Sequence, residues 1–151
     1  MVERNDVVEH TGRKLLMTRV FAARRPLVFD AWTKPEHVAK WWGPRGFSLP
    51  SCEMDLRPGG AFRFVMRGPD GVDRPFEGVY AEVERPERIV FGGTIHDGVH
   101  VNTTVTFEDR GAETLVTVAQ TFSAESDATR GSAEGWAQTL DRLGEALAAA
   151  R

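Results

Sequence analysis

Residues 29–44 read FDAWTKPEHVAKWWGP and contain three of the four tryptophans of the chain. A proline can open a helix because the first helical amide has no partner, and Val38, Trp41 and Trp42 recur at helical spacing after Pro35. A glycine and a proline then end the pattern. The segment therefore predicts a short helix ending in aromatic rings. Such rings either anchor a core or form the rim of a binding cavity, because aromatic side chains dominate burial in both settings.

The residues before this segment predict a strand and a first short helix. Residues 14–21, KLLMTRVF, are rich in strand-forming side chains. Pro26 suits the first turn of a helix, in which Val28 and Trp32 share a face until Pro35 interrupts it. We therefore expect two short helices after the first strand.

From residue 47 onward the chain consists of short runs of strand-forming residues separated by turns. Turn signals occur as Gly-Gly at 59–60, Pro-Asp-Gly at 69–71, His-Asp-Gly at 96–98 and Asp-Arg-Gly at 109–111. Phe62, Phe64 and Met66 alternate with more polar positions, as a strand with one solvated face requires. The spacing predicts an antiparallel meander of about six strands.

The inward face of residues 76–83 stays open between two interpretations. Phe76 and Tyr80 share one side of the expected strand, whereas Val79 and Val83 lie on an opposite side that is equally apolar. Either side can face the core. The sequence therefore does not decide whether these two aromatic rings lie inside.

The last part of the chain predicts a long amphipathic helix that packs on the sheet. Ser126 and Asp127 suit its N-cap, and the helix should continue to about Ala149. Its apolar stripe consists of Ala133, Trp136, Ala137, Leu140, Leu143 and Leu147. Gly135 lowers helix propensity beside Trp136. Either the helix approaches the sheet closely at this glycine, or the missing side chain leaves room for a ligand.

Length and charge favour one soluble domain. A chain of 151 residues can bury a single sizeable core, and its net charge of −3 is spread without the basic stripe that nucleic acids or anionic membranes require. Residues 1–13 are polar and lack a hydrophobic period, so we expect a flexible tail there and a single domain over residues 14–151. The sequence contains neither an apolar run long enough for a membrane span nor a secretory signal, which predicts a cytoplasmic protein.

Few residues have the pattern of a catalytic, metal or cofactor site. The single cysteine, Cys52, alternates with Met54 on an apolar side and is expected to be an inert, packed thiol. His96 and His100 flank a turn aspartate, and a solvated hairpin accounts for them better than a metal site does. No glycine-rich phosphate loop occurs. We therefore predict no catalytic residues, no metal and no cofactor.

The expected order of elements, one strand, two short helices, about six strands and a long helix, is the helix-grip arrangement. Eight blocks carry a resemblance: TRVF (18–21), LVFDAWT (27–33), PEHVAKWWGP (35–44), DLRPGG (55–60), FRFVMR (62–67), FEGVY (76–80), PERIVF (86–91) and GWAQTLDRL (135–143). In this order they resemble the bacterial domain family named after the activator of Hsp90 ATPase, within the START-like, Bet v 1-like (SRPBCC) superfamily. The resemblance implies an α+β fold, with a curved antiparallel sheet of about seven strands wrapped on the C-terminal helix.

The resemblance also implies a cavity between the long helix and the sheet. Members of the superfamily differ in what they hold, so the fold alone does not identify a ligand. On this analogy the ligand-binding residues are Trp41, Phe62, Phe64, Met66, Phe76, Tyr80, Trp136 and Leu140. An apolar cavity with few polar groups suits a small hydrophobic or aromatic molecule. Ordinary core packing is the alternative for each of these side chains.

Three classes of function fit these expectations. We favour noncatalytic binding of a small hydrophobic molecule for sensing, sequestration, resistance or a stress response. The first alternative is an interaction module that modulates a chaperone or regulator. The second is a cyclase, dehydratase or hydrolase acting on a polyketide-like substrate, which would need Tyr80, His100 or Thr104 inside the cavity. Exposed strand edges, or aromatic surface near Trp42, would also support a homodimer.

The tryptophans of residues 29–44 receive three different roles. Trp32 shares a helix face with Val28 and is assigned to the core. Trp41 is the candidate residue at the cavity mouth. Trp42 is assigned to loop packing or to a contact surface.

Overall fold

The computed structural model describes residues 6–150, which form one antiparallel sheet and four helices. The strands are β1 (Asp6–Thr11), β2 (Lys14–Phe21), β3 (Ser48–Met54), β4 (Ala61–Arg67), β5 (Asp73–Glu84), β6 (Arg88–Thr94), β7 (His100–Arg110) and β8 (Glu113–Phe122). The helices are α1 (Arg25–Thr33), α2 (Pro35–Trp41), α3 (Asp127–Arg130) and α4 (Ser132–Ala149).

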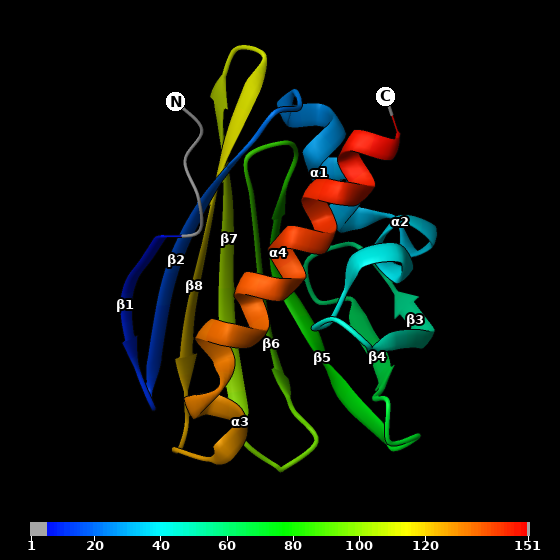
Figure 1. Ribbon diagram of the computed structural model, residues 1–151, viewed down its shortest axis with the longest axis vertical. Coiled ribbons are helices and arrows are strands. Elements are labelled where there is room, and N and C mark those ends of the chain that lie inside the picture. The colour runs from blue at the N-terminus through cyan, green and yellow to red at the C-terminus, as the bar shows by residue number, and fades with distance from the viewer. Residues whose placement is uncertain (1–5, 151) are drawn as a thin grey trace.

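The eight strands follow the order β1-β2-β8-β7-β6-β5-β4-β3, and every pairing is antiparallel. From β3 to β8 the sheet is a meander, β2 pairs with β8, and β1 pairs with β2 at the edge of the sheet. The helix α4 crosses one face of the sheet diagonally, and α1 and α2 lie on the same side, with α1 against β7 and β8 and α2 against β3 (Figure 1). This is the α+β helix-grip fold that the order of elements predicts.

The N-terminal strand β1 corrects the expectation of a flexible tail over residues 1–13. Residues Asp6–Thr11 pair with β2 through a hairpin whose turn contains Gly12, so the sheet has eight strands rather than about seven. Val7 and Val8 are 48% and 60% exposed. Backbone hydrogen bonding rather than side-chain burial holds this edge strand, and for that reason its hydrophobic pattern gives no signal. The part of the expectation that concerns residues 1–5 lies outside the described residues.

The strand β5 contains a bulge, and this bulge decides which side of residues 76–83 faces the core. Phe76 and Tyr80 face the core at 8% and 3% exposure, and Val79 is 51% exposed on the outer face. The pairing with β6 shifts between Tyr80 and Glu82. A bulge adds one residue to a strand, which reverses the alternation beyond it. Val83 therefore packs against the core as well, and each of the two apolar sides is inward along part of the strand.

The C-terminal helix is divided where one continuous helix was expected. Ser126 caps α3 as predicted. Its hydroxyl accepts a hydrogen bond from the Thr129 backbone amide, and the Ser126 backbone amide donates to Thr129 Oγ1. The helix then stops at Gly131, whose ψ of 2° departs from helical geometry, and α4 begins at Ser132. The break places residues 128–132 at one end of the sheet.

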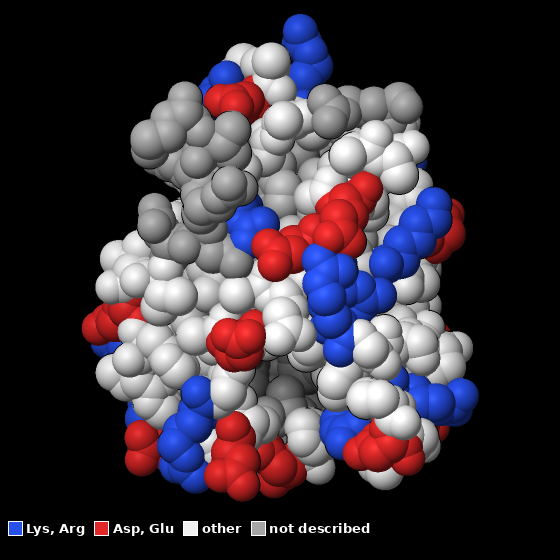
Figure 2. Space-filling model, in the orientation of Figure 1, with Lys and Arg blue, Asp and Glu red and all other residues white. Residues whose placement is uncertain are grey.

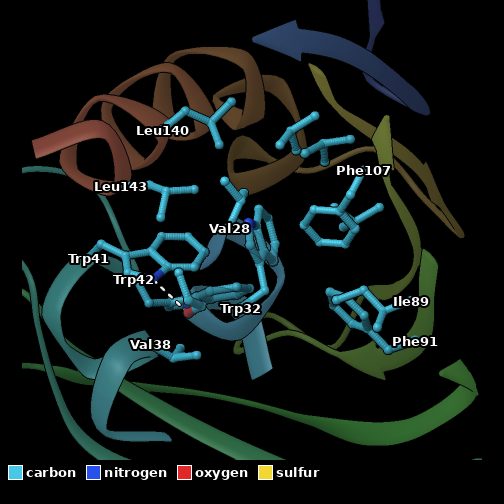
Figure 3. Close-up of a cluster of buried hydrophobic side chains, with 14 of the residues drawn as sticks. Val28, Trp32, Val38, Trp41, Trp42, Ile89, Phe91, Phe107, Leu140 and Leu143 are labelled. Atoms are coloured by element: carbon cyan, nitrogen blue, oxygen red, sulfur yellow. Dashed lines mark hydrogen bonds between the residues drawn. The ribbon is translucent and has the colours of Figure 1, made fainter. Parts of the chain in front are cut away.

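Aromatic rings fill the space between α1, α2, α4 and the sheet (Figure 3). Trp32 lies at their centre, with its ring centroid 4.7 Å from Trp41, 6.0 Å from Phe107 and 5.8 Å from the stacked ring of Trp136. Leu140 of α4 is fully buried above this group. Trp32 is 3% exposed, which confirms its assignment to the core. No helix within residues 6–150 has the length and hydropathy of a membrane span.

Candidate functional site

A cavity of about 330 Å³ opens beside the N-terminal half of α4. One side of the cavity is formed by residues 42–47 after α2 and by the α3–α4 junction. The sheet contributes the hairpin ends of β4 and β5, the turn between β6 and β7, and the inner face of β7 and β8. Figure 2 shows the hollow in the lower half of the face that carries α4. Pockets for small molecules have volumes of this order, so the space suits a compact ligand.

Two tryptophans form the aromatic wall of the cavity. The backbone of Trp42 is extended because α2 ends at Trp41, and this turns the Trp42 ring away from the helix. Its centroid lies 5.5 Å from the Trp136 ring at an interplanar angle of 79° and 4.9 Å from Phe64. Edge-to-face packing of this kind holds each ring in a fixed orientation. The cavity therefore has a rigid aromatic side.

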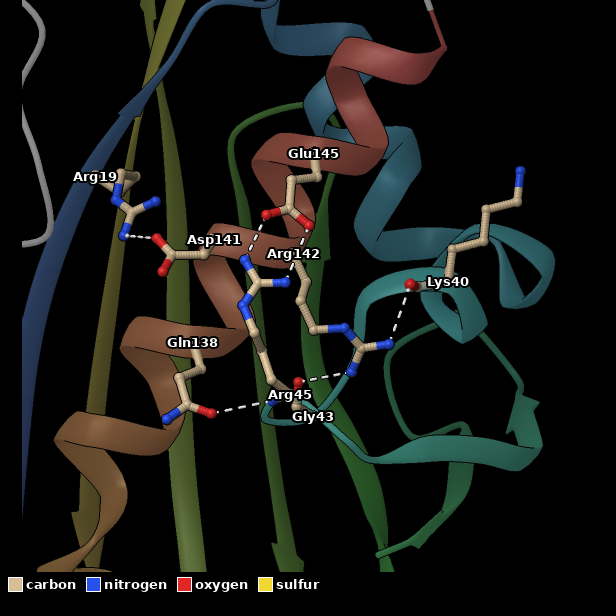
Figure 4. Close-up of polar contacts among 8 residues, drawn as sticks. All are labelled: Arg19, Lys40, Gly43, Arg45, Gln138, Asp141, Arg142 and Glu145. Atoms are coloured by element: carbon tan, nitrogen blue, oxygen red, sulfur yellow. Dashed lines mark hydrogen bonds and ion pairs between the residues drawn. The ribbon is translucent and has the colours of Figure 1, made fainter. Parts of the chain in front are cut away.

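Arginine contacts fasten the loop after α2 to α4 (Figure 4). Arg142 Nη1 donates to the carbonyls of Trp42, Gly43 and Pro44 at 3.3, 2.8 and 3.2 Å, and Nη2 donates to the Lys40 carbonyl at 3.3 Å. Burial lowers the pKa of Arg142 from its usual value. The guanidinium caps carbonyls left free at the end of α2, and it thereby sets the position of the cavity wall.

A second arginine makes a more exposed connection between the same segments. The Arg45 amide donates to Gln138 Oε1 at 3.0 Å, and the Arg45 guanidinium pairs with Glu145. Ion pairs of this kind in solvent contribute little to stability. The contacts of Arg142, which are more sheltered from solvent, therefore carry most of the attachment.

The interior of the cavity contains one buried amide, that of Gln120 on β8. This side chain is 9% exposed and lies on the inner face with Val116 and Val118. Its Nε2 donates to Thr103 Oγ1 on β7 and its Oε1 accepts from Trp136 Nε1, both at 3.0 Å. The amide thus connects two strands and α4 at the cavity wall.

The titratable side chains on the lining are Arg74 and His96. Arg74 donates to both carboxylate oxygens of Asp70, at 3.3 and 2.8 Å, and lies over the Phe47 ring at 5.3 Å. The guanidinium holds the pKa of Asp70 at about 2, so the pair stays ionised at neutral pH and its charges offset each other. His96 is exposed in the β6–β7 turn.

The structure divides the eight predicted ligand-binding residues into three groups. Met66, Phe76 and Trp136 line the cavity. Phe62, Phe64 and Tyr80 instead border a void of about 10 Å³ in the core. Trp41 and Leu140 are fully buried and line neither space.

The structure places Trp42, rather than Trp41, on the cavity lining. Trp41 is 0% exposed, and its Nε1 donates to the Ala31 carbonyl at 3.0 Å, which makes it a core residue. Trp42 lines the cavity. The reason is local, because Trp41 is the last residue of α2 and keeps the helical direction toward the core. Spacing alone cannot locate the turn at which a helix stops.

Several lining residues were not predicted, and two of them carry a signal in the sequence. Gln120 is a polar residue at an inward position of an alternating strand, which is a departure from the pattern of a half-buried strand. Gly135 lies on the lining, and a Cβ built on it would meet only Pro44 Cγ within 4 Å, at 3.8 Å. No sheet atom lies that close. Of the two alternatives for Gly135, the structure therefore does not support close approach of helix and sheet, and the glycine instead lies on the cavity lining beside Pro44.

The polar residues considered for catalysis lie outside the cavity. Tyr80 is buried in the core, whereas His100 and Thr104 alternate with the inward residues of β7 and lie on its outer face. Desolvation raises the pKa of Tyr80 above its usual value. Among residues 6–150, no three His, Cys, Asp or Glu side chains gather closely enough to hold a metal ion.

Cys52 is half-buried on β3 and packs against the core. Burial raises the pKa of its thiol to about 11, and the Glu36 carboxylate adds to the shift. Because the thiolate is the reactive form, we expect alkylation by iodoacetamide at pH 8 to be about a hundredfold slower than for an exposed cysteine. Mass spectrometry of timed samples measures this rate, with the urea-unfolded chain as the reference. Equal rates in the folded and unfolded chains would contradict the prediction.

Solved structures share this architecture along nearly the whole chain. The AHSA1-like protein from Aeromonas hydrophila has 27% identity and a TM-score of 0.70, with 89% of this chain and 93% of that chain covered. A protein from Nitrosomonas europaea has 25% identity and a TM-score of 0.80, with coverages of 94% and 98%. A protein from Chromobacterium violaceum has 26% identity and a TM-score of 0.80, with coverages of 91% and 98%. No curated protein matches the chain significantly.

The family model for activator of Hsp90 ATPase homolog 1-like proteins matches residues 22–148. This range includes α1, α2, strands β3 to β8 and nearly all of α4, and hence every wall of the cavity. The agreement of sequence model, strand order and helix placement shows that the chain belongs to the activator of Hsp90 ATPase homolog 1-like family.

Proposed function

We propose that the protein binds a small, largely apolar or aromatic molecule in the cavity beside α4 and that it does so without catalysis. The observation that carries the proposal is the cavity itself, about 330 Å³ of space lined mainly by aromatic and aliphatic side chains, with Gly135 on its lining. Burial of apolar ligand surface there would supply the affinity. One buried amide, an already paired arginine and a single histidine exposed in the β6–β7 turn are a poor set for acid–base chemistry.

Titration with a neutral dye that brightens in apolar surroundings, N-phenyl-1-naphthylamine, tests the proposal directly. We expect saturable brightening and quenching of tryptophan fluorescence, because Trp42 and Trp136 line the cavity. An excess of a nonfluorescent aromatic competitor should reverse both signals. Dye fluorescence that does not saturate would contradict binding at a defined site.

Two glycines of α4 provide a matched pair of variants for the same titration. Gly135 lies on the cavity lining, whereas a Cβ at Gly144 would make an ordinary contact with Phe21 at 3.7 Å. Replacing either glycine by alanine should stabilise the helix by up to about 1 kcal/mol. Only Gly135→Ala adds a methyl group to the cavity, and we expect it to weaken dye binding by about three- to tenfold.

Thermal unfolding and dye titration of both variants separate the two effects. Gly135→Ala and Gly144→Ala should both raise the melting temperature, and Gly144→Ala should leave the dye affinity unchanged. Equal dye affinity in Gly135→Ala and the unmodified protein would place the dye elsewhere.

A further inference from the structure

The amide of Gln120 is held in one orientation by its two partners. The indole Nε1 of Trp136 can only donate, so the oxygen of the amide must face Trp136 and the nitrogen must face Thr103. The nitrogen carries two hydrogens, and one of them serves Thr103 Oγ1. The second has no acceptor among the described residues. A donor of this kind, 9% exposed at the cavity lining, is costly to leave unpaired when a ligand displaces water.

The charge of the lining disfavours an ionised ligand. No Asp, Glu or Lys side chain is part of the described lining, the Arg74 guanidinium is already paired with Asp70, and His96 is exposed in the β6–β7 turn rather than in the interior. A carboxylate entering the apolar interior would lose its hydration without gaining a free counter-charge. An uncharged ligand avoids this cost and can still satisfy the Gln120 donor.

We propose that the cavity selects an uncharged aromatic molecule that enters with a hydrogen-bond acceptor first, and that this acceptor, a ketone, quinone or ester carbonyl, receives the second Nε2 hydrogen of Gln120. The rings of Trp42 and Trp136 then cover the aromatic part of the ligand. The inference rests on the proposed function, since it assumes that the cavity binds a small molecule. It adds the chemical class of the ligand and its orientation.

Three probes of nearly equal shape test the class of ligand. They are 2-acetylnaphthalene, which carries a ketone, 2-isopropenylnaphthalene, which replaces the carbonyl oxygen by a methylene group, and 2-naphthoate, which is ionised. Competition against N-phenyl-1-naphthylamine gives the three dissociation constants. We expect the ketone to bind about tenfold more tightly than the alkene, because one hydrogen bond to a buried donor has that effect. The carboxylate should bind more weakly than the ketone by at least about tenfold.

The variant Gln120→Met keeps the length of the side chain and removes the donor. It should abolish the preference for the ketone over the alkene while leaving the alkene bound. Thr121→Val lies on the outer face of the same strand and should keep the tenfold preference. Near-ultraviolet circular dichroism checks that each variant is folded. If Gln120→Met does not fold, the ratio of ketone to alkene in the unmodified protein still decides the question.

The outcomes separate this inference from the proposed function. Equal binding of ketone and alkene by the unmodified protein, or tighter binding of the carboxylate, overturns the inference and leaves ligand binding intact. A preference for the ketone that persists in folded Gln120→Met also overturns it. Failure of the dye and of all three probes to bind removes the proposed function, and the inference with it.

Discussion

Trp41→Ala should reduce the free energy of unfolding by about 3–5 kcal/mol, because it removes a large buried aromatic side chain and leaves a cavity. The Trp41 ring is 0% exposed and lies 4.7 Å from Trp32 and 5.6 Å from Trp42, centroid to centroid. The substitution also leaves the Ala31 carbonyl without the indole donor that it has at 3.0 Å. Equilibrium unfolding in urea measures the change.

Two further variants distinguish a core role of Trp41 from the role at the cavity mouth that helical spacing suggests. Trp41→Phe keeps a ring but loses the hydrogen bond to Ala31, and it should cost about 1–3 kcal/mol. Trp42→Ala removes a lining ring and should abolish most dye binding. The folded fraction of Trp41→Ala should bind the dye normally. A stable Trp41→Ala protein that no longer binds the dye would reverse these assignments.

The fold could be predicted from the sequence because its patterns are local. Pro26 and Pro35 mark the starts of the two short helices, and alternation in β4 identifies Phe62 and Phe64 as inward. The strand β1 was not predicted, because an edge strand that buries little side-chain surface has no hydrophobic period. The break between α3 and α4 at Gly131 was not predicted, because glycine inside a helical pattern is often tolerated.

The cavity could be predicted only in part, since periodicity reports the face of a strand and not the position along it. Phe62, Phe64 and Met66 share the inner face of β4, yet only Met66, near the end of the strand, reaches the cavity. The two phenylalanines lie deeper among aromatic neighbours, with a centroid distance of 5.4 Å between them. The open space depends on where the loop after α2 and the α3–α4 junction meet the sheet, and that is a tertiary property.

Arg142→Met should cost about 2 kcal/mol of unfolding free energy and should also weaken dye binding, because one guanidinium holds four carbonyl groups of residues 40–44 against α4. Methionine keeps the packing of the aliphatic part of the arginine side chain, so the loss of unfolding free energy measures the contribution of the guanidinium. The expected effect on binding has a direct cause. Trp42, Gly43 and Pro44 all line the cavity, and a loop without its anchor holds the Trp42 ring less firmly.

Arg45→Met is the matched control, because Arg45 connects the same loop to the same helix from the solvent side. Its guanidinium pairs with Glu145 on the surface, where screening by water makes the contribution small. The backbone contact from the Arg45 amide to Gln138 would remain. We therefore expect a urea midpoint and a dye affinity close to those of the unmodified protein. Equal losses in Arg45→Met and Arg142→Met would mean that general charge attraction, rather than the partly buried carbonyl contacts of Arg142, fixes the wall of the cavity.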